Sequence, residues 1–119
     1  NFLVNHPKVT NVYYPGLEQH AGHSIHQKQC EDCGAILSFE VDSVKQIETL
    51  FTHCRVPIVA VSLGGVESIL SYPWAMSHAS MPEKDRLAMG VTETLVRLSC
   101  GIEDVEDLIA DLDDALNAM

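Results

Sequence analysis

Lysine and arginine are scarce in this sequence. Together they number seven, against 17 aspartates and glutamates, and the formal net charge is −10 over 119 residues. Nucleic acids and anionic membranes are bound by clustered basic side chains, whereas the basic residues here are scattered along the chain. The charge balance therefore argues against either kind of partner.

Long apolar runs are absent as well. A helix that spans a bilayer needs about 20 consecutive apolar residues, and the sequence has no such run. It begins at Asn1 without an initiator methionine and without the basic and apolar regions of a signal peptide. The length suits one domain with a single core. We expect a piece of a longer cytoplasmic polypeptide, whose function is not self-contained.

A second C-x-x-C motif, which a strong zinc signature would have, is also missing. His20, His23 and His26 precede Cys30 and Cys33 and offer enough nitrogen and sulfur ligands for zinc. On a helix, however, His26 drifts away from the face that His20 and His23 share. Without a secretory signal the four cysteines are expected to be reduced. We expect a polar surface helix and no metal, and keep a non-catalytic metal-binding module as the alternative from another class.

The spacing of the apolar residues predicts alternating strands and helices. Every second residue from Ala35 to Val41 is apolar, with Ser38 and Glu40 on the other face, which is typical of a half-buried strand. Ser43 and Gln46 form a capping box ahead of residues with helical spacing. The pattern predicts an α/β (α+β) two-layer sandwich with one helical face. We expect strands at residues 8–14, 35–41, 58–62 and 95–100, and helices at residues 18–32, 43–54, 80–90 and 103–116.

A lone arginine interrupts an apolar strand. Arg97 lies between Val96 and Leu98, and burying an unpaired guanidinium costs several kcal/mol, so this side chain needs an anion. Two sources are open at this point. The anion is either Glu67 or Glu103 within the fold, or the carboxylate of an amino-acid substrate.

Two glycines follow the expected strand at residues 58–62. Gly64 and Gly65 are not part of a G-x-G-x-x-G or Walker motif, so a nucleotide site is disfavoured. Glycines let backbone approach closely and leave the Ser62 hydroxyl and the next N–H groups free for a ligand. Ser62 lacks the G-x-S-x-G context of a nucleophile. This turn and Arg97 together resemble half of a carboxylate-binding site.

Several collinear motifs resemble the C-terminal domain of the Cys/Met metabolism family, the pyridoxal-phosphate (PLP) enzymes of transsulfuration. The resemblance implies the small C-terminal domain of a fold-type-I PLP-dependent transferase, in which a mostly antiparallel sheet is covered by helices. It also implies a preceding PLP-binding domain outside this chain, and a homotetramer that acts on a small sulfur amino acid. The motifs lie at residues 12–17, 34–40, 62–68, 76–79 and 95–107.

The resemblance also implies roles for individual residues. Arg97 matches the arginine that holds the substrate's α-carboxylate in a two-pronged pair. Ser62 and the backbone of Leu63 match positions that orient this carboxylate and the internal lysine. The lysine that bonds PLP lies in the preceding domain, so no catalytic or cofactor-binding residue is expected here and the isolated chain should be inactive. Structural residues near the site would be Gly64, Gly65 and Glu67.

Val61 bears on the choice of reaction. In γ-synthases and γ-lyases of the cystathionine type, the residue before the motif serine is often glutamate, which meets a distal amino group. Valine there, together with residues 69–82, resembles β-lyases of the Gram-positive type. The expected activity is therefore β-elimination from cystathionine to homocysteine, pyruvate and ammonia. Cystathionine γ-synthase, cystathionine γ-lyase and methionine γ-lyase are the alternatives, and valine also suits the last of these.

Overall fold

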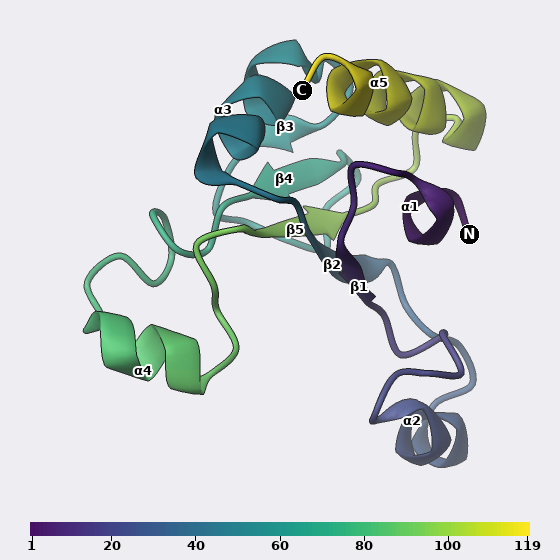
Figure 1. The fold of residues 1–119 in the computed structure, drawn as a ribbon. Helices are drawn as coiled ribbons and strands as arrows, with labels where there is room; N and C mark the ends of the chain where they lie inside the picture. Colours follow the sequence, from purple (N-terminus) through teal and green to yellow (C-terminus); the bar gives the residue numbers. More distant parts are fainter.

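A computed structural model describes residues 1–119, which form a five-stranded sheet with its main helices packed on one face (Figure 1). Both expected layers are present, and the predicted two-layer sandwich is confirmed. No helix combines the length and the apolar character needed to cross a membrane. The elements are α1 (Phe2–Asn5), β1 (Asn11–Tyr13), α2 (His23–Gln29), β2 (Ile36–Glu40), α3 (Val44–His53), β3 (Ile58–Val59), β4 (Ile69–Ser71), α4 (Glu83–Ala88), β5 (Leu95–Ser99) and α5 (Val105–Asn117).

The strand order is β1-β2-β5-β4-β3, with β5 in the centre. Every neighbouring pair is antiparallel except β3 and β4, which are parallel. A parallel pair needs a connection that returns the chain to the same end of the sheet. Here that connection is residues 60–68, and it contains the glycine turn. The expected mostly antiparallel sheet is therefore observed, and its one parallel pair lies beside the turn.

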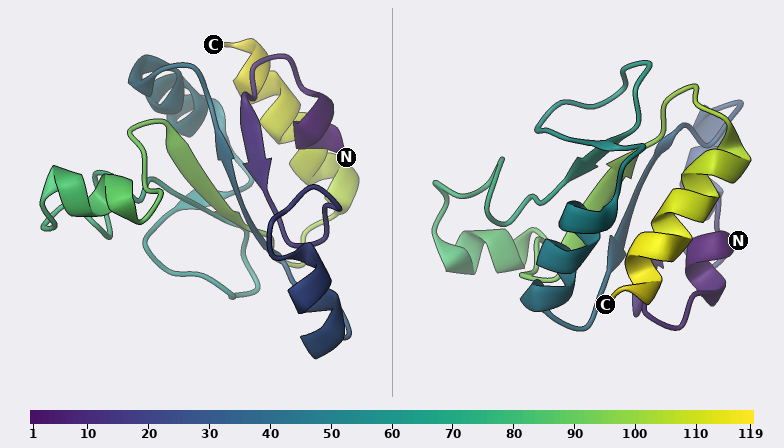
Figure 2. Two further views of the ribbon diagram at one scale, coloured as in Figure 1. Left: turned by 60° about the horizontal axis from the view of Figure 1, so that its bottom comes forward. Right: turned by 90° about the horizontal axis from the view of Figure 1, so that it is seen from above.

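Helices α1, α3 and α5 form the covering layer, and α3 and α5 lie side by side over the sheet (Figure 2). The strands alternate, so that every second residue faces these helices. Val96 and Leu98 of β5 are buried in this core, whereas Arg97 between them faces the other way. The centre of the core comprises Phe39, Leu70, Val96 and Leu98 from the strands and Ile47, Leu50, Leu112 and Leu116 from the helices.

Two elements were not predicted, and others are shorter than expected. β4 has three residues, all buried, so it shows no period-two alternation that would mark it in the sequence. The four-residue helix α1 is too short to show a helical period. The helix expected at residues 18–32 covers only His23–Gln29, and the strand expected at residues 58–62 stops at Val59. After Val59 the chain leaves the sheet to form the turn.

Two of the acidic side chains of α5 contact the rest of the chain, although the charge pattern predicts a fully solvated outer face. Asp111 accepts hydrogen bonds from the backbone N–H groups of Arg55 and Val56, with nitrogen-to-Oδ2 distances of 2.9 and 3.0 Å. Asp113 lies 3.3 Å from Nε2 of the buried His6. These two carboxylates therefore attach α5 to the chain after α3 and to the end of α1.

Replacing Asp111 by alanine should destabilise the domain. Two backbone N–H groups would lose their acceptor, and the expected cost is about 1–2 kcal/mol. The test is the thermal unfolding midpoint of the full-length protein carrying Asp111→Ala. Asp114→Ala is the matched control, because Asp114 lies on the same helix and is exposed. Equal shifts for the two variants would contradict this role of Asp111.

Candidate functional site

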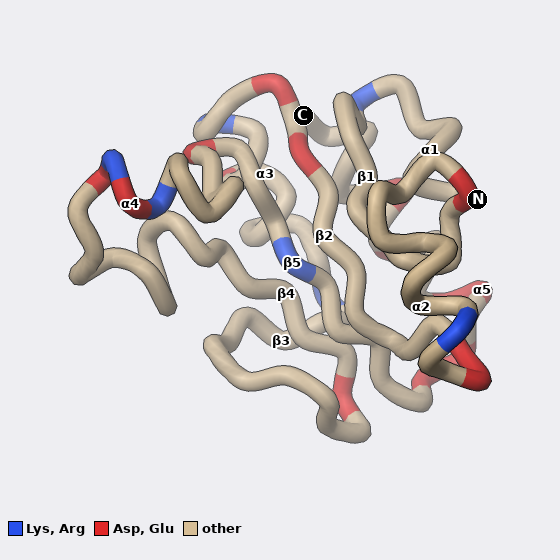
Figure 3. Tube along the Cα trace, turned by 90° about the horizontal axis from the view of Figure 1, so that it is seen from below, with Lys and Arg blue, Asp and Glu red and all other residues tan.

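Arg97 occupies the middle of the sheet face that the helices leave open. β5 is the central strand, and its basic segment lies among uncharged chain when the molecule is seen from below (Figure 3). In the register of the sheet, Arg97 stands opposite Ser38 of β2 and Ser71 of β4, and Ser38 stands opposite Tyr13 of β1. Paired residues share a face. A row of polar side chains therefore crosses the open face, with Arg97 as its only charge.

The guanidinium is held by backbone rather than by an acid. Nη2 of Arg97 donates to the carbonyl oxygens of Val61 and Ser62, both at 2.9 Å. Because the strand order is β5-β4-β3, the side chain passes over β4 to reach these residues, which follow β3. Two sequence-predicted site residues, Val61 and Ser62, are thus brought to Arg97. They contribute main-chain carbonyl groups to this contact.

No carboxylate of this chain pairs with Arg97. The one contact between a basic side chain and a carboxylate within 4 Å joins His6 and Asp113. Glu103 instead accepts hydrogen bonds from the backbone N–H and the hydroxyl of Ser68, at 2.6 and 2.8 Å. Glu67 is exposed and folds back beside Gly65. The alternative of an ion pair with Glu67 or Glu103 is therefore wrong for this fold.

Two polar atoms, from residues paired across β4 and β5, have no hydrogen-bond partner. Nε of Arg97 and Oγ of Ser71 are both buried without a hydrogen bond, and Nη1 of Arg97 makes none either. An unpaired buried donor costs about 1–3 kcal/mol, and more when it is charged. Carbonyl dipoles orient a guanidinium but do not neutralise it. The site therefore retains the capacity to bind an anion.

The turn at residues 61–67 is exposed, and a hydrogen bond fixes it at Gly64. Gly64 has φ +71°, which favours glycine, and its N–H donates to Oγ of Ser99 at 2.9 Å. A Cβ at Gly64 would have no atom within 4 Å. Glycine is therefore favoured there by the positive φ and not by a lack of space. Ser62 and Leu63 are exposed beside it. Their outer surface is open to a ligand.

Sequence reasoning missed Ser71 and Ser99. Ser99 lies two residues after Arg97 on the same strand, so period-two alternation alone places it on the same face. Ser71 was not recognisable, because its position beside Arg97 depends on the register between β4 and β5. Both side chains are buried.

The histidine and cysteine segment forms no cluster. Within residues 1–119, no three His, Cys, Asp or Glu side chains stand where they could hold a metal ion. His23 bonds the carbonyl oxygen of Pro15 at 2.7 Å, and His26 bonds that of Asp32 at 2.9 Å. Cys30 and Cys33 are free thiols. These contacts give the histidines a structural use.

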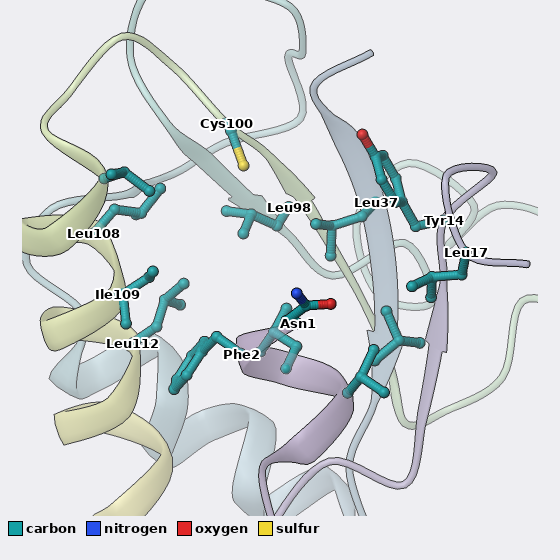
Figure 4. A pocket seen from close by; sticks show the side chains of 14 residues that line it. Asn1, Phe2, Tyr14, Leu17, Leu37, Leu98, Cys100, Leu108, Ile109 and Leu112 are labelled. Carbon is teal, nitrogen blue, oxygen red and sulfur yellow. The ribbon is translucent and has the colours of Figure 1, made fainter. Parts of the chain in front are cut away.

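An apolar hollow of about 280 Å³ lies on the opposite face of the sheet, between α1, β1 and α5 (Figure 4). Of the 14 residues that line it, 13 are hydrophobic, among them Leu37, Leu98 and Leu112. No charged side chain lines it, and the sheet separates it from Arg97. It is not a site for a carboxylate.

The fold is therefore a small α/β domain whose open face carries an arginine without a carboxylate partner. The chain matches the model of the family described as Cys/Met metabolism PLP-dependent enzyme over residues 1–117. It is 49% identical to the cystathionine beta-lyase MetC of Bacillus subtilis (strain 168) over 115 residues, covering 97% of this chain and 30% of that relative. It is 47% identical to an L-methionine gamma-lyase of Fusobacterium nucleatum subsp. polymorphum over 116 residues, covering 97% of this chain and 29% of the relative.

Solved structures agree. A cystathionine gamma synthase from Xanthomonas oryzae pv. oryzae, in complex with aminoacrylate and cysteine, superposes with a TM-score of 0.94 at 40% identity, covering 98% of this chain and 30% of that chain. The chain belongs to the Cys/Met metabolism PLP-dependent enzyme family. It spans about 30% of the length of the relatives it matches.

The pH dependence of Glu103 gives a test of the contacts behind the turn. Hydrogen bonds, first of all from the backbone N–H of Ser68, hold the pKa of Glu103 below its ordinary value of 4.5. A depressed pKa stabilises the fold above the ordinary value, and this stabilisation is lost as the pH falls through the folded-state pKa. Glu103→Gln should therefore lower the thermal unfolding midpoint of the full-length protein at neutral pH, by a margin that shrinks below pH 4.5. Glu48→Gln, at an exposed position, is the control. A margin independent of pH would contradict the role of this carboxylate.

Proposed function

We propose that the full-length protein is a PLP-dependent carbon–sulfur lyase of transsulfuration, in which this chain supplies the arginine that binds the substrate's α-carboxylate. The observation that carries the proposal is Arg97, a guanidinium fixed by two backbone carbonyls, unpaired with any acid and buried at Nε. The family to which the chain belongs and the open face on which Arg97 lies support it.

A carboxylate suits this guanidinium for reasons of geometry. The planar fork of an arginine matches two carboxylate oxygens, and a charge-assisted pair of this kind is about twice as strong as a neutral hydrogen bond. Nε and Nη1 are the donors left without partners. Ser62, exposed in the adjoining turn, offers its hydroxyl to the same carboxylate. Fixing the carboxylate sets the orientation of the bonds at the substrate's α-carbon.

The residues of this chain suit the substrate rather than the cofactor. None of the four lysines, Lys8, Lys28, Lys45 and Lys84, lies on a strand beside Arg97, and we propose that the lysine that bonds PLP comes from outside the chain. When bound, PLP supplies the electron sink for carbanion chemistry at the α-carbon. Arg97 and the turn then bind and orient the substrate. We propose that the isolated chain is inactive.

The proposed reaction is β-elimination from cystathionine, giving homocysteine, pyruvate and ammonia. The Val61 side chain is 53% exposed beside the carbonyl that holds Arg97, so it offers an apolar surface and no charge for a distal amino group. The 49% identity to a cystathionine beta-lyase supports this choice. The second candidate is γ-elimination, which the 47% identity to a methionine gamma-lyase favours. We further propose a cytoplasmic homotetramer, on the family resemblance.

The keto acid released from cystathionine distinguishes the two reactions. We expect the full-length protein with PLP to release pyruvate, identified by mass spectrometry, which separates it from 2-oxobutyrate. Release of 2-oxobutyrate from cystathionine or methionine would assign γ-elimination. If a keto acid or a thioether product forms only with an activated homoserine and a thiol, the protein is a γ-synthase.

Arg97→Ala tests the proposed carboxylate site. In the full-length protein, removal of a charge-assisted two-pronged pair should lower kcat/KM by about 100-fold or more, equivalent to about 3 kcal/mol. Arg97→Lys should recover only part of this, because lysine keeps the charge without the planar fork. Arg55→Ala is the control, since Arg55 is exposed and its side chain has no partner. Unchanged turnover in Arg97→Ala would make this a non-catalytic binding domain.

A further inference from the structure

The turn beside Arg97 has little to hold it except a few hydrogen bonds. Residues 61–67 are all exposed. Val61, Leu63 and Val66 are apolar residues that each expose about half or more of their surface, at 53%, 51% and 61%. A segment with so little buried apolar surface is expected to open readily. Its position over the sheet must therefore come from specific polar contacts.

One contact comes from the arginine strand itself. Oγ of Ser99 accepts the N–H of Gly64 at 2.9 Å, and Ser99 is 0% exposed. Ser99 and Arg97 are two positions apart on β5, which places their side chains on the same face, with backbones separated by roughly 6.7 Å. A single rigid strand therefore contacts the turn twice. Arg97 binds its carbonyls, and Ser99 binds its glycine N–H.

A second set of contacts holds the far end of the turn to the chain after β5. The Ser68 hydroxyl donates to Oε2 of Glu103 at 2.8 Å and accepts the N–H of Gly101 at 2.9 Å. The N–H of Ile102 donates to the carbonyl oxygen of Val66 at 2.9 Å. A Cβ at Gly101 would overlap that same carbonyl, so glycine is required there by close approach. This end is thus anchored independently of Ser99.

We propose that Ser99 is a positioning residue for substrate binding, which acts through the turn on Arg97. This inference rests on the proposed function, because it takes Arg97 as the carboxylate anchor. The far end of the turn is held by Ser68 and Glu103. Ser99 is the one side chain that fixes Gly64, the glycine two residues after the carbonyl of Ser62. Without the hydroxyl, the carbonyls of Val61 and Ser62 lose their fixed place, and the guanidinium loses its orientation.

The test is a double-mutant cycle in the full-length protein with PLP. Ser99→Ala should raise KM for the amino-acid substrate about tenfold, with a much smaller change in kcat, as expected when one buried hydrogen bond is lost. In an Arg97→Ala background the same substitution should have almost no further effect on kcat/KM, because a residue that acts through Arg97 has nothing left to orient. A merely structural serine would give independent, multiplicative losses.

Control variants distinguish a failure of this inference from a failure of the proposed function. Thr52→Ala removes an exposed hydroxyl bond on α3 and should leave KM unchanged. If Ser99→Ala does not fold, Ser99→Cys keeps nearly the same volume with a weaker acceptor, and should raise KM severalfold with the same dependence on Arg97. A KM unchanged by Ser99→Ala, or a loss that persists in full without Arg97, overturns this inference alone. If Arg97→Ala itself leaves kcat/KM unchanged, the proposed function fails instead.

Discussion

The contact between the Arg97 guanidinium and the carbonyl oxygens of Val61 and Ser62 is the constraint around which this domain is arranged. A full positive charge sits at the centre of a sheet and is met only by backbone dipoles. To provide them, the chain must leave β3 after two residues and turn back over the sheet, and then return as the parallel strand β4. The residue paired with Arg97 on β4 is Ser71, whose small side chain leaves room for the arginine to cross.

The two faces of the sheet have separate tasks. On one face, Val96 and Leu98 pack under α3 and α5 and provide the apolar burial that stabilises the fold. On the other, Arg97 and Ser99 from the same strand carry the polar contacts. Because alternate residues of one strand serve both faces, these polar groups are positioned by the central strand of the sheet. Such a site is built on a rigid element rather than on a loop alone.

Sequence patterns predicted those features that depend on local spacing. The alternation at residues 35–41 and the capping box at Ser43 correspond to β2 and α3. The arginine without an obvious partner was recognised from its apolar neighbours. Whether Glu103 pairs with Arg97 could not be read from local spacing. It depends on Ser68, whose backbone N–H and hydroxyl both donate to the Glu103 carboxylate. Likewise, β4 and the place of Ser71 follow from strand pairing across the sheet, which no short-range pattern contains.

The use of main-chain carbonyls at Val61 and Ser62 has an evolutionary consequence. A carbonyl group is the same whichever side chain the residue carries, so the tether on Arg97 does not depend on the identity of residue 61. That side chain projects from a turn whose backbone is fixed elsewhere, and more than half of its surface is exposed. Residue 61 is therefore free to diverge without loss of the carbonyl contacts on Arg97. Under the proposed function, a family can in this way change which part of a substrate residue 61 meets while Arg97 keeps hold of the carboxylate that every amino acid carries.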